Sequence, residues 1–120
     1  MLDRRFGRIV NVASSAAIAM PAATVAYGAA KAAVVALTKG WARAWGPSIR
    51  VNCVAPGPTR TEASADIDPA MLERMSRETP LGRIGEPDEI ADAVAYLLSE
   101  ASSFVSGHTL MVTGGRIMLP

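Results

Sequence analysis

Short runs of β-branched and apolar residues alternate along this chain with longer runs whose apolar residues recur at helical spacing. The β-rich runs are residues 8–14 (RIVNVAS), 49–55 (IRVNCVA) and 108–113 (HTLMVT). Such runs, separated by helical segments, are typical of βα units in which the strands of a parallel sheet are buried on both faces. Because crossovers between parallel strands are right-handed, we expect the three strands to lie side by side.

Three helices are predicted around these strands. Residues 24–45 contain no proline and end before a Gly-Pro stop, with Thr24 as a candidate N-cap. Asp68 can cap a short helix that has a proline at its first position. Residues 86–99 form the clearest amphipathic segment, because apolar residues recur there at helical spacing: Ile90, Ala93, Val94, Leu97 and Leu98.

The composition limits the chain to one modest core and excludes several classes of protein. With 120 residues, half of them apolar, the chain has material for a single domain, residues 1–120. The net charge is +1 and the basic residues are scattered among acidic ones, so we expect no nucleic-acid partner. The single cysteine, Cys53, cannot form an internal disulfide and is expected to pack as a small buried residue in a cytoplasmic protein.

One segment superficially resembles a signal peptide or a membrane span. Residues 9–30 are uncharged and follow Arg4 and Arg5. However, polar residues and a proline interrupt this run, and most of its remaining residues are alanine. We therefore expect neither targeting nor association with a membrane.

A phenol and an ammonium lie four residues apart in the stretch AYGAAKAAVVAL. In a helix, Tyr27 and Lys31 share a face one turn inside the N-terminus. The ammonium and the positive end of the helix dipole both favour an ionised phenol, which suits proton transfer. On spacing alone, a tyrosine at the rim of the core and a solvated lysine explain the pair better, since Tyr-x-x-x-Lys has many accidental matches.

Polar groups at two strand ends change this interpretation. Ser14 ends the first predicted strand, and Pro56-Gly57 ends the second, with Thr59 and Thr61 in the loop beyond. Open parallel sheets gather their functional groups at the carboxyl ends of the strands. We therefore expect these residues to converge with the Tyr-Lys pair in one crevice. A metal site is not expected, because the only histidine, His108, has no cysteine or carboxylate cluster at ligand spacing.

Five sequence blocks together carry a resemblance to a known family. In order, they are GRIVNVASS, YGAAK, IRVNCVAPGPTRT, PLGRIGEPDEIADAVAYLLS and SGHTLMVTGG, between about residues 7 and 118. The chain resembles the C-terminal half of a short-chain dehydrogenase/reductase of the bacterial type that includes 3-oxoacyl-carrier-protein reductases. The resemblance implies an α/β fold, part of a Rossmann-like doubly wound parallel sheet. It also implies hydride transfer between NAD or NADP and a small carbonyl or alcohol substrate, and a homo-oligomer, dimer or tetramer, in the full-length form.

The resemblance assigns roles to the predicted site residues. Ser14 corresponds to the serine that hydrogen-bonds the substrate oxygen, and Ser15 is the weaker candidate for this role. Tyr27 corresponds to the acid/base that exchanges a proton with that oxygen. Lys31 corresponds to the residue that holds the nicotinamide ribose and helps the tyrosine to ionise.

The same resemblance extends to the loop after the second strand. Pro56, Gly57 and Thr59 correspond to the loop packed against the nicotinamide, and Thr61 to the threonine that bonds its carboxamide. Residues 62–83 correspond to the mobile lid over the substrate. We call them the lid segment.

The dinucleotide-binding half of such an enzyme is missing from the sequence. No two of the ten glycines are separated by a single residue, so no G-x-G turn is available for a pyrophosphate. The family's Asn-Asn-Ala-Gly segment is also absent, and the strand containing Ile9 is expected to keep one edge unpaired. We therefore expect a truncated reductase that is weakly active or inactive alone. The alternative is a non-catalytic remnant that associates with a full-length family member.

Overall fold

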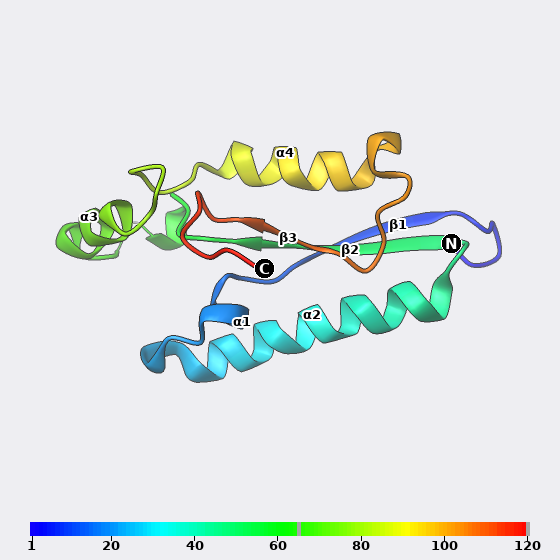
Figure 1. The fold of residues 1–120 in the computed structure, drawn as a ribbon, viewed down its shortest axis with the longest axis horizontal. Helices are drawn as coiled ribbons and strands as arrows, with labels where there is room; N and C mark the ends of the chain where they lie inside the picture. Colours follow the sequence, from blue (N-terminus) through cyan, green and yellow to red (C-terminus); the bar gives the residue numbers. More distant parts are fainter. Residues whose placement is uncertain (65, 120) are drawn as a thin grey trace.

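Three parallel strands form the centre of the molecule, with helices on both faces of the sheet (Figure 1). The strands are β1 (Gly7–Val12), β2 (Ile49–Pro56) and β3 (Thr109–Val112), and their order in the sheet is β1-β2-β3. The computed structural model describes residues 1–64 and 66–119. The predicted α/β fold with three parallel strands side by side is confirmed.

The register brings the carboxyl ends of the strands to the same end of the sheet. Val12 lies opposite Val54, and Pro56 lies opposite Val112. β1 ends earlier than predicted, yet the N–H groups of Ala13 and Ser15 still donate to Val54 O and Pro56 O, each at 2.8 Å. The chain therefore stays attached to β2 as it leaves the sheet, which fixes the position of the serines that follow β1.

Two long helices cover the sheet. α2 (Val25–Trp45) lies on one face and α4 (Pro87–Leu98) on the other (Figure 1). Both agree with the predicted ranges to within one residue. Within the described ranges, none of the helices combines the length and the apolar character needed to cross a bilayer.

The start of α2 differs from the prediction. The Thr24 side chain makes no capping hydrogen bond to the helix. Two short elements precede α2 instead: α1 (Ala16–Ala19), which the sequence did not reveal, and a 3₁₀ turn at Ala22–Thr24. Thr24 therefore occupies the predicted N-cap position but its side chain does not cap the helix, because the chain enters α2 through an already hydrogen-bonded turn.

A third helix, α3 (Pro69–Arg77), lies in the lid segment beyond the ends of the strands (Figure 1). Its predicted cap is confirmed, because Asp68 Oδ1 accepts a hydrogen bond from Ala70 N at 2.9 Å. Two further 3₁₀ turns, Glu62–Ser64 and Glu100–Ser102, lie in the connections. Residue 65, which falls in the lid segment, lies outside the described residues.

The core centres on β2. Val51, Cys53, Val54 and Ala55 are fully buried, and Leu97 brings the largest fully buried side chain from α4. Cys53 is buried as predicted, and this burial raises the pKa of its thiol. The sheet is thus well covered at its central strand.

β1 is one of the two edge strands of the sheet. Within the described residues it pairs only with β2, so its second edge has no strand partner, as the sequence suggested. Val12 is 52% exposed and the preceding Phe6 is 59% exposed. β1 therefore has exposed apolar side chains at its end and just before its start.

Candidate active site

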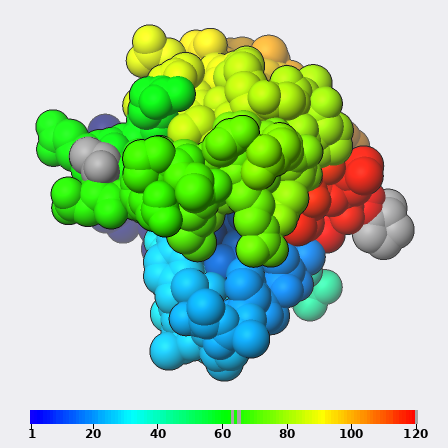
Figure 2. Space-filling model, turned by 90° about the vertical axis from the view of Figure 1, so that its left-hand side faces the viewer, coloured from blue at the N-terminus to red at the C-terminus, as the bar shows by residue number. Residues whose placement is uncertain are grey.

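A cleft of about 730 Å³ opens at the carboxyl ends of β1 and β2. Figure 2 shows it from outside, between the green lid segment and the blue residues of α1 and the start of α2, with the red C-terminal residues at its border. The described residues that line it include Ser14, Ser15, Tyr27, Gly57 and Thr59. The structure therefore brings together polar groups from two strand ends and from the helix between them.

Ser14 lies at the point where the chain leaves the sheet. Its Oγ accepts a hydrogen bond from Ala16 N at 3.2 Å, and its carbonyl accepts one from Ala17 N at 3.0 Å. The side chain is half-buried and faces the cleft. Because Oγ acts as an acceptor in this contact, the hydroxyl hydrogen remains available for donation to a ligand.

Tyr27 and Lys31 project from the first two turns of α2. The Tyr27 side chain lines the cleft and is 50% exposed. Lys31 Nζ lies 5.8 Å from the centre of the Tyr27 ring and donates to Val12 O at 3.0 Å. The lysine is therefore held between the end of β1 and the tyrosine, close to the cleft but not among the described residues that line it.

The loop after β2 is fixed by its own hydrogen bonds. Gly57 N donates to Val112 O at 2.9 Å, and Thr59 Oγ1 donates to Gly57 O at 3.0 Å. Pro56 is half-buried as the last residue of β2, and Thr61 is exposed, with its N–H donating to Ser64 Oγ at 2.8 Å. Neither Pro56 nor Thr61 is among the described residues that line the cleft.

Gly57 allows the close approach of this loop to β3. A Cβ at this position would lie 3.0 Å from Thr113 Cα, a backbone atom that cannot turn aside. We expect Gly57→Ala to destabilise the fold by about 1–3 kcal/mol, the usual cost of overpacking. Urea unfolding, followed by circular dichroism, measures this change.

Gly40→Ala is the matched control for this substitution. Gly40 lies inside α2, and a Cβ there would meet nothing within 4 Å. Replacing an interior helical glycine by alanine stabilises a helix by roughly 0.5–1 kcal/mol. Opposite signs for the two variants are expected, and equal stability of Gly57→Ala and the unmodified chain would contradict the close approach.

The lid segment contributes side chains that the sequence analysis did not single out as site residues. The residues of the segment that line the cleft include Ile67, Met71, Leu72, Arg74, Met75 and Glu78. The polar composition of the segment gave no sign of which residues would face inward. Only the amphipathic spacing within α3 could have suggested it.

Arg116 also reaches the cleft and was likewise missed. The chain turns after β3 at Gly114 and Gly115, whose φ angles of 62° and 84° favour glycine. Arg116 then donates to Met75 O at 3.0 Å and to Glu78 Oε2 at 2.5 Å. The C-terminal end of α3 is therefore held by a residue 41 positions away in the sequence, a pairing that no local pattern encodes.

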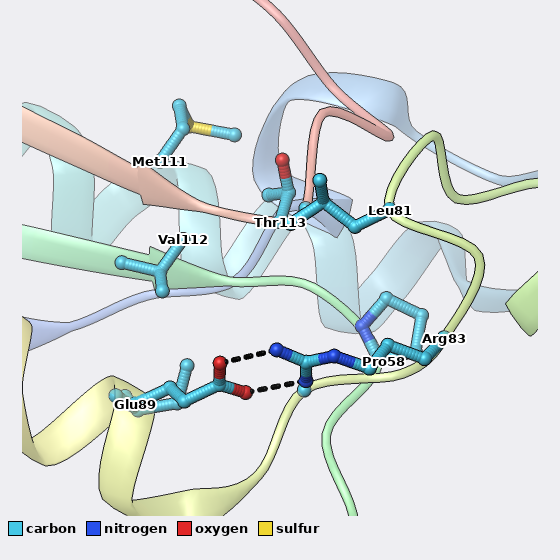
Figure 3. Close-up of a pocket in the computed structure, with 10 residues that line it drawn as sticks. Pro58, Leu81, Arg83, Glu89, Met111, Val112 and Thr113 are labelled. Carbon is cyan, nitrogen blue, oxygen red and sulfur yellow. Dashed lines mark hydrogen bonds and ion pairs between the residues drawn. The ribbon is translucent and has the colours of Figure 1, made fainter.

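A second pocket, of about 240 Å³, lies between α4 and β3 (Figure 3). At its border, Arg83 Nη1 and Nη2 lie 2.7 and 2.6 Å from the two carboxylate oxygens of Glu89. Glu89 Oε2 also accepts a hydrogen bond from Glu86 N at 2.8 Å, at the start of α4. The Arg83 guanidinium, followed by the Glu86 N–H, lowers the pKa of Glu89 to about 2. This pair ties the end of the lid segment to α4.

The lowered pKa of Glu89 predicts a pH-dependent contribution to stability. An unfolded glutamate titrates near about 4.3, so the contribution is fully present above that pH and is lost as the pH falls towards 2. Glu89→Gln is expected to lower the unfolding midpoint at pH 7 and to flatten its dependence on pH between about 4 and 2. Thermal unfolding at several pH values measures both effects.

Glu73→Gln provides the comparison for Glu89→Gln. Glu73 lies in an exposed ion pair with Arg77, with one contact of 2.9 Å. Because exposed ion pairs contribute little to stability, this variant should unfold close to the unmodified chain. An equal loss of stability in the two variants would show that the bidentate geometry of Glu89 has no special effect.

Comparison with known proteins places this fold in a class. The family model described as enoyl-(acyl carrier protein) reductase matches residues 1–116. The chain belongs to the short-chain dehydrogenase/reductase family, and it corresponds to the C-terminal half of the family's fold.

Individual relatives support the same assignment. The A-factor type gamma-butyrolactone 1'-reductase (1S-forming) of Streptomyces virginiae is 45% identical over 117 residues, which are 94% of this chain and 46% of that protein. The 3-oxoacyl-[acyl-carrier-protein] reductase of Thermotoga maritima is 38% identical over 119 residues, covering 98% and 48% of the two chains. The chain thus spans about half the length of the curated relatives it matches.

Solved structures of the family superpose closely on this fold. A short-chain dehydrogenase/reductase from Brucella melitensis has a TM-score of 0.89 at 39% identity, over 93% of this chain and 46% of its own. The aldohexose dehydrogenase of Thermoplasma acidophilum, in ligand-free form, has a TM-score of 0.88 at 34% identity, over 100% and 53%. The three-stranded unit described above is therefore shared with complete members of the family.

Proposed function

We propose that this chain forms the proton-transfer half of an NAD(P)-dependent reductase or dehydrogenase that acts on a small carbonyl or alcohol substrate. The observation that carries the proposal is the presence of Ser14 and Tyr27 in one cleft, with Lys31 held beside the tyrosine. Two hydroxyl groups thus face one cleft, where we propose that both contact the substrate oxygen. Membership of the short-chain dehydrogenase/reductase family supports the reaction class.

Each residue has a role that its position allows. Ser14 donates its hydroxyl hydrogen to the substrate oxygen, because its Oγ already serves Ala16 N as an acceptor. Tyr27 gives a proton to that oxygen during reduction, or takes it during oxidation, from a side chain half exposed to the cleft. The Lys31 ammonium, held by Val12 O, stabilises negative charge on the phenol oxygen.

The groups at the strand ends also suit the nicotinamide end of a dinucleotide. The Lys31 ammonium has N–H groups besides the one that Val12 O accepts, and they match the hydroxyl groups of a ribose. Thr59 Oγ1, whose hydrogen goes to Gly57 O, can only accept a hydrogen bond from a ligand. When bound, the nicotinamide cofactor supplies or accepts the hydride. The pyrophosphate end is not matched, because the chain has no glycine-rich turn. We propose that a dinucleotide-binding half supplies this missing part.

A chimeric enzyme tests the proposal. The part of the Streptomyces virginiae reductase that precedes the matched region is fused to Met1 of this chain, which restores a complete cofactor site. We expect the chimera to bind NADH or NADPH in calorimetry and to oxidise it when a ketone is added. The 120-residue chain alone should bind the cofactor weakly. A chimera that binds the cofactor but does not reduce carbonyl compounds would overturn the proposal.

A second candidate function rests on the open edge of β1. The unpaired edge and the exposed Phe6 and Val12 favour association with another polypeptide. The chain would then act as a non-catalytic remnant that binds a full-length family member. An in-frame TGxxxGxG sequence upstream of the codon for Met1 supports the enzyme, whereas an intact stop codon and promoter before Met1 support the remnant.

A further inference from the structure

Three charged side chains line the apolar cleft, and their charges do not cancel. Among the described lining residues these are Arg74, Glu78 and Arg116. Glu78 Oε1 lies 2.7 Å from Arg74 Nε, and Glu78 Oε2 lies 2.5 Å from Arg116 Nη2. The hydrogen bond from Arg74 is the main cause of a lowered pKa for Glu78, which therefore stays ionised at neutral pH. One carboxylate thus serves two guanidinium groups, which leaves an excess of one positive charge.

Arg116 is the more shielded of the two arginines. Its side chain is 23% exposed, whereas that of Arg74 is 75% exposed. The bond to Met75 O, at 3.0 Å, holds the guanidinium in place at the end of α3. Within the described residues, its hydrogen bonds use two of the five N–H groups of an arginine. A charge in this setting is less screened by water, so it attracts an anion more strongly than an exposed one does.

The surroundings of the cluster are suited to an aliphatic chain. Ile67, Met71 and Met75 from the lid segment line the cleft, and Ile117 lines it beside Arg116. Methionine adapts to ligands of different shape, because its side chain is unbranched and polarisable. An anion that reached Arg116 would therefore bring any attached hydrocarbon into contact with apolar side chains.

We propose that the cleft binds carbonyl compounds that carry a carboxylate on an aliphatic chain, and that Arg116 is the residue that recognises the carboxylate. As a statement about the substrate, this inference rests on the proposed function. A carboxylate fits the planar fork of a guanidinium, and its single charge equals the excess charge of the cluster. A doubly charged phosphate would exceed it. Arg116 keeps its bonds to Met75 O and Glu78 and receives the carboxylate through its remaining N–H groups.

The binding step is tested on the 120-residue chain without cofactor. The ¹⁵N-labelled protein is titrated with octanoate and, separately, with octanamide, which has the same hydrocarbon chain but no charge. We expect octanoate to bind about tenfold more tightly, since one charge-assisted contact is gained. The largest shifts should occur in the Arg116 Nε–H resonance and in the amide signals of α3.

Two substitutions separate Arg116 from the general positive charge of α3. Arg116→Met should make octanoate and octanamide bind equally, and Arg116→Lys should keep part of the difference because it keeps the charge. Arg77→Met is the matched control. Arg77 lies on α3, pairs with Glu73 and does not line the cleft, so the preference for octanoate should persist in this variant. Equal binding of the two ligands by the unmodified chain overturns the inference, as does a preference that survives Arg116→Met.

The binding preference for octanoate does not depend on proton transfer by Tyr27. Tyr27→Phe should leave the preference for octanoate intact, since no proton is transferred in this assay. Loss of the preference in a chimera that still reduces ketones overturns only the role of Arg116. A preserved preference in a chimera without reductase activity overturns only the proposed function.

Discussion

Replacing Tyr27 with Phe is expected to reduce the turnover of a reductase that contains this chain by roughly 10²–10⁴-fold, the usual contribution of a general acid or base. The substitution removes only the phenolic oxygen, so the ring keeps its place on α2 and its contacts with the cleft. Cofactor affinity should therefore stay nearly unchanged. Steady-state kinetics with a ketone substrate, together with calorimetric titration of the cofactor, measure the two quantities on the chimera described above.

Two further variants sharpen this prediction. Tyr96, the other tyrosine in the chain, lies on α4 with its side chain 44% exposed and does not line the cleft, so Tyr96→Phe should leave turnover unchanged. Lys31→Ala should weaken both turnover and cofactor binding, because its ammonium is proposed to serve the ribose as well as the tyrosine. If Tyr27→Phe and Lys31→Ala lose cofactor affinity equally, the two roles have been assigned incorrectly.

The parts of the fold that follow a repeating pattern were predictable from the sequence. The strands are short β-branched runs that must be buried on both faces, and α4 carries apolar residues at helical spacing. The position of the candidate site was also predictable from the sequence. Parallel strands bring their carboxyl ends to one end of the sheet, so Ser14 and Gly57 were expected together before their geometry was known. In the structure both residues line one cleft with Tyr27.

The parts that depend on distant contacts were not predictable. α1 is a single turn whose residues have no apolar periodicity, and its position depends on contacts with α2. Arg116 contacts α3 only because two glycines with positive φ turn the chain back towards the lid segment. A sequence pattern reports local spacing, whereas these contacts depend on where the sheet places segments that are far apart in the chain.

The open edge of β1 is related to the dinucleotide-binding half that we propose to complete the site. Among the described residues β1 is paired on one side only, and the sequence lacks the glycine turn that a cofactor pyrophosphate requires. A partner segment that pairs with β1 would also bring a second strand end next to Lys31, whose ammonium now rests on Val12 O. Completion of the sheet and completion of the cofactor site are therefore expected to occur together.

The largest effect on stability is expected at Leu97. This residue is 1% exposed and is the largest fully buried side chain, and it packs from α4 in a core with few other large residues. Leu97→Ala should lower the free energy of unfolding by about 2–5 kcal/mol, through lost burial and the cavity left behind. That loss is a large fraction of the roughly 5–15 kcal/mol that typical domains possess.

Leu98→Ala is the control that isolates burial for Leu97→Ala. The neighbouring Leu98 lies on the same helix and is 38% exposed, so the same deletion should cost much less. Urea unfolding gives both values, and an unchanged m-value would show that the unfolded state is not altered. Because α4 holds the sheet on the face opposite to α2, a large loss for Leu97→Ala with a small one for Leu98→Ala would mean that a single side chain anchors this layer. Equal losses would instead mean that α4 is held mainly through contacts at its two ends. At its start these are the contacts between Arg83 and Glu89. At its end Arg50 donates to Leu97 O and Ser99 O.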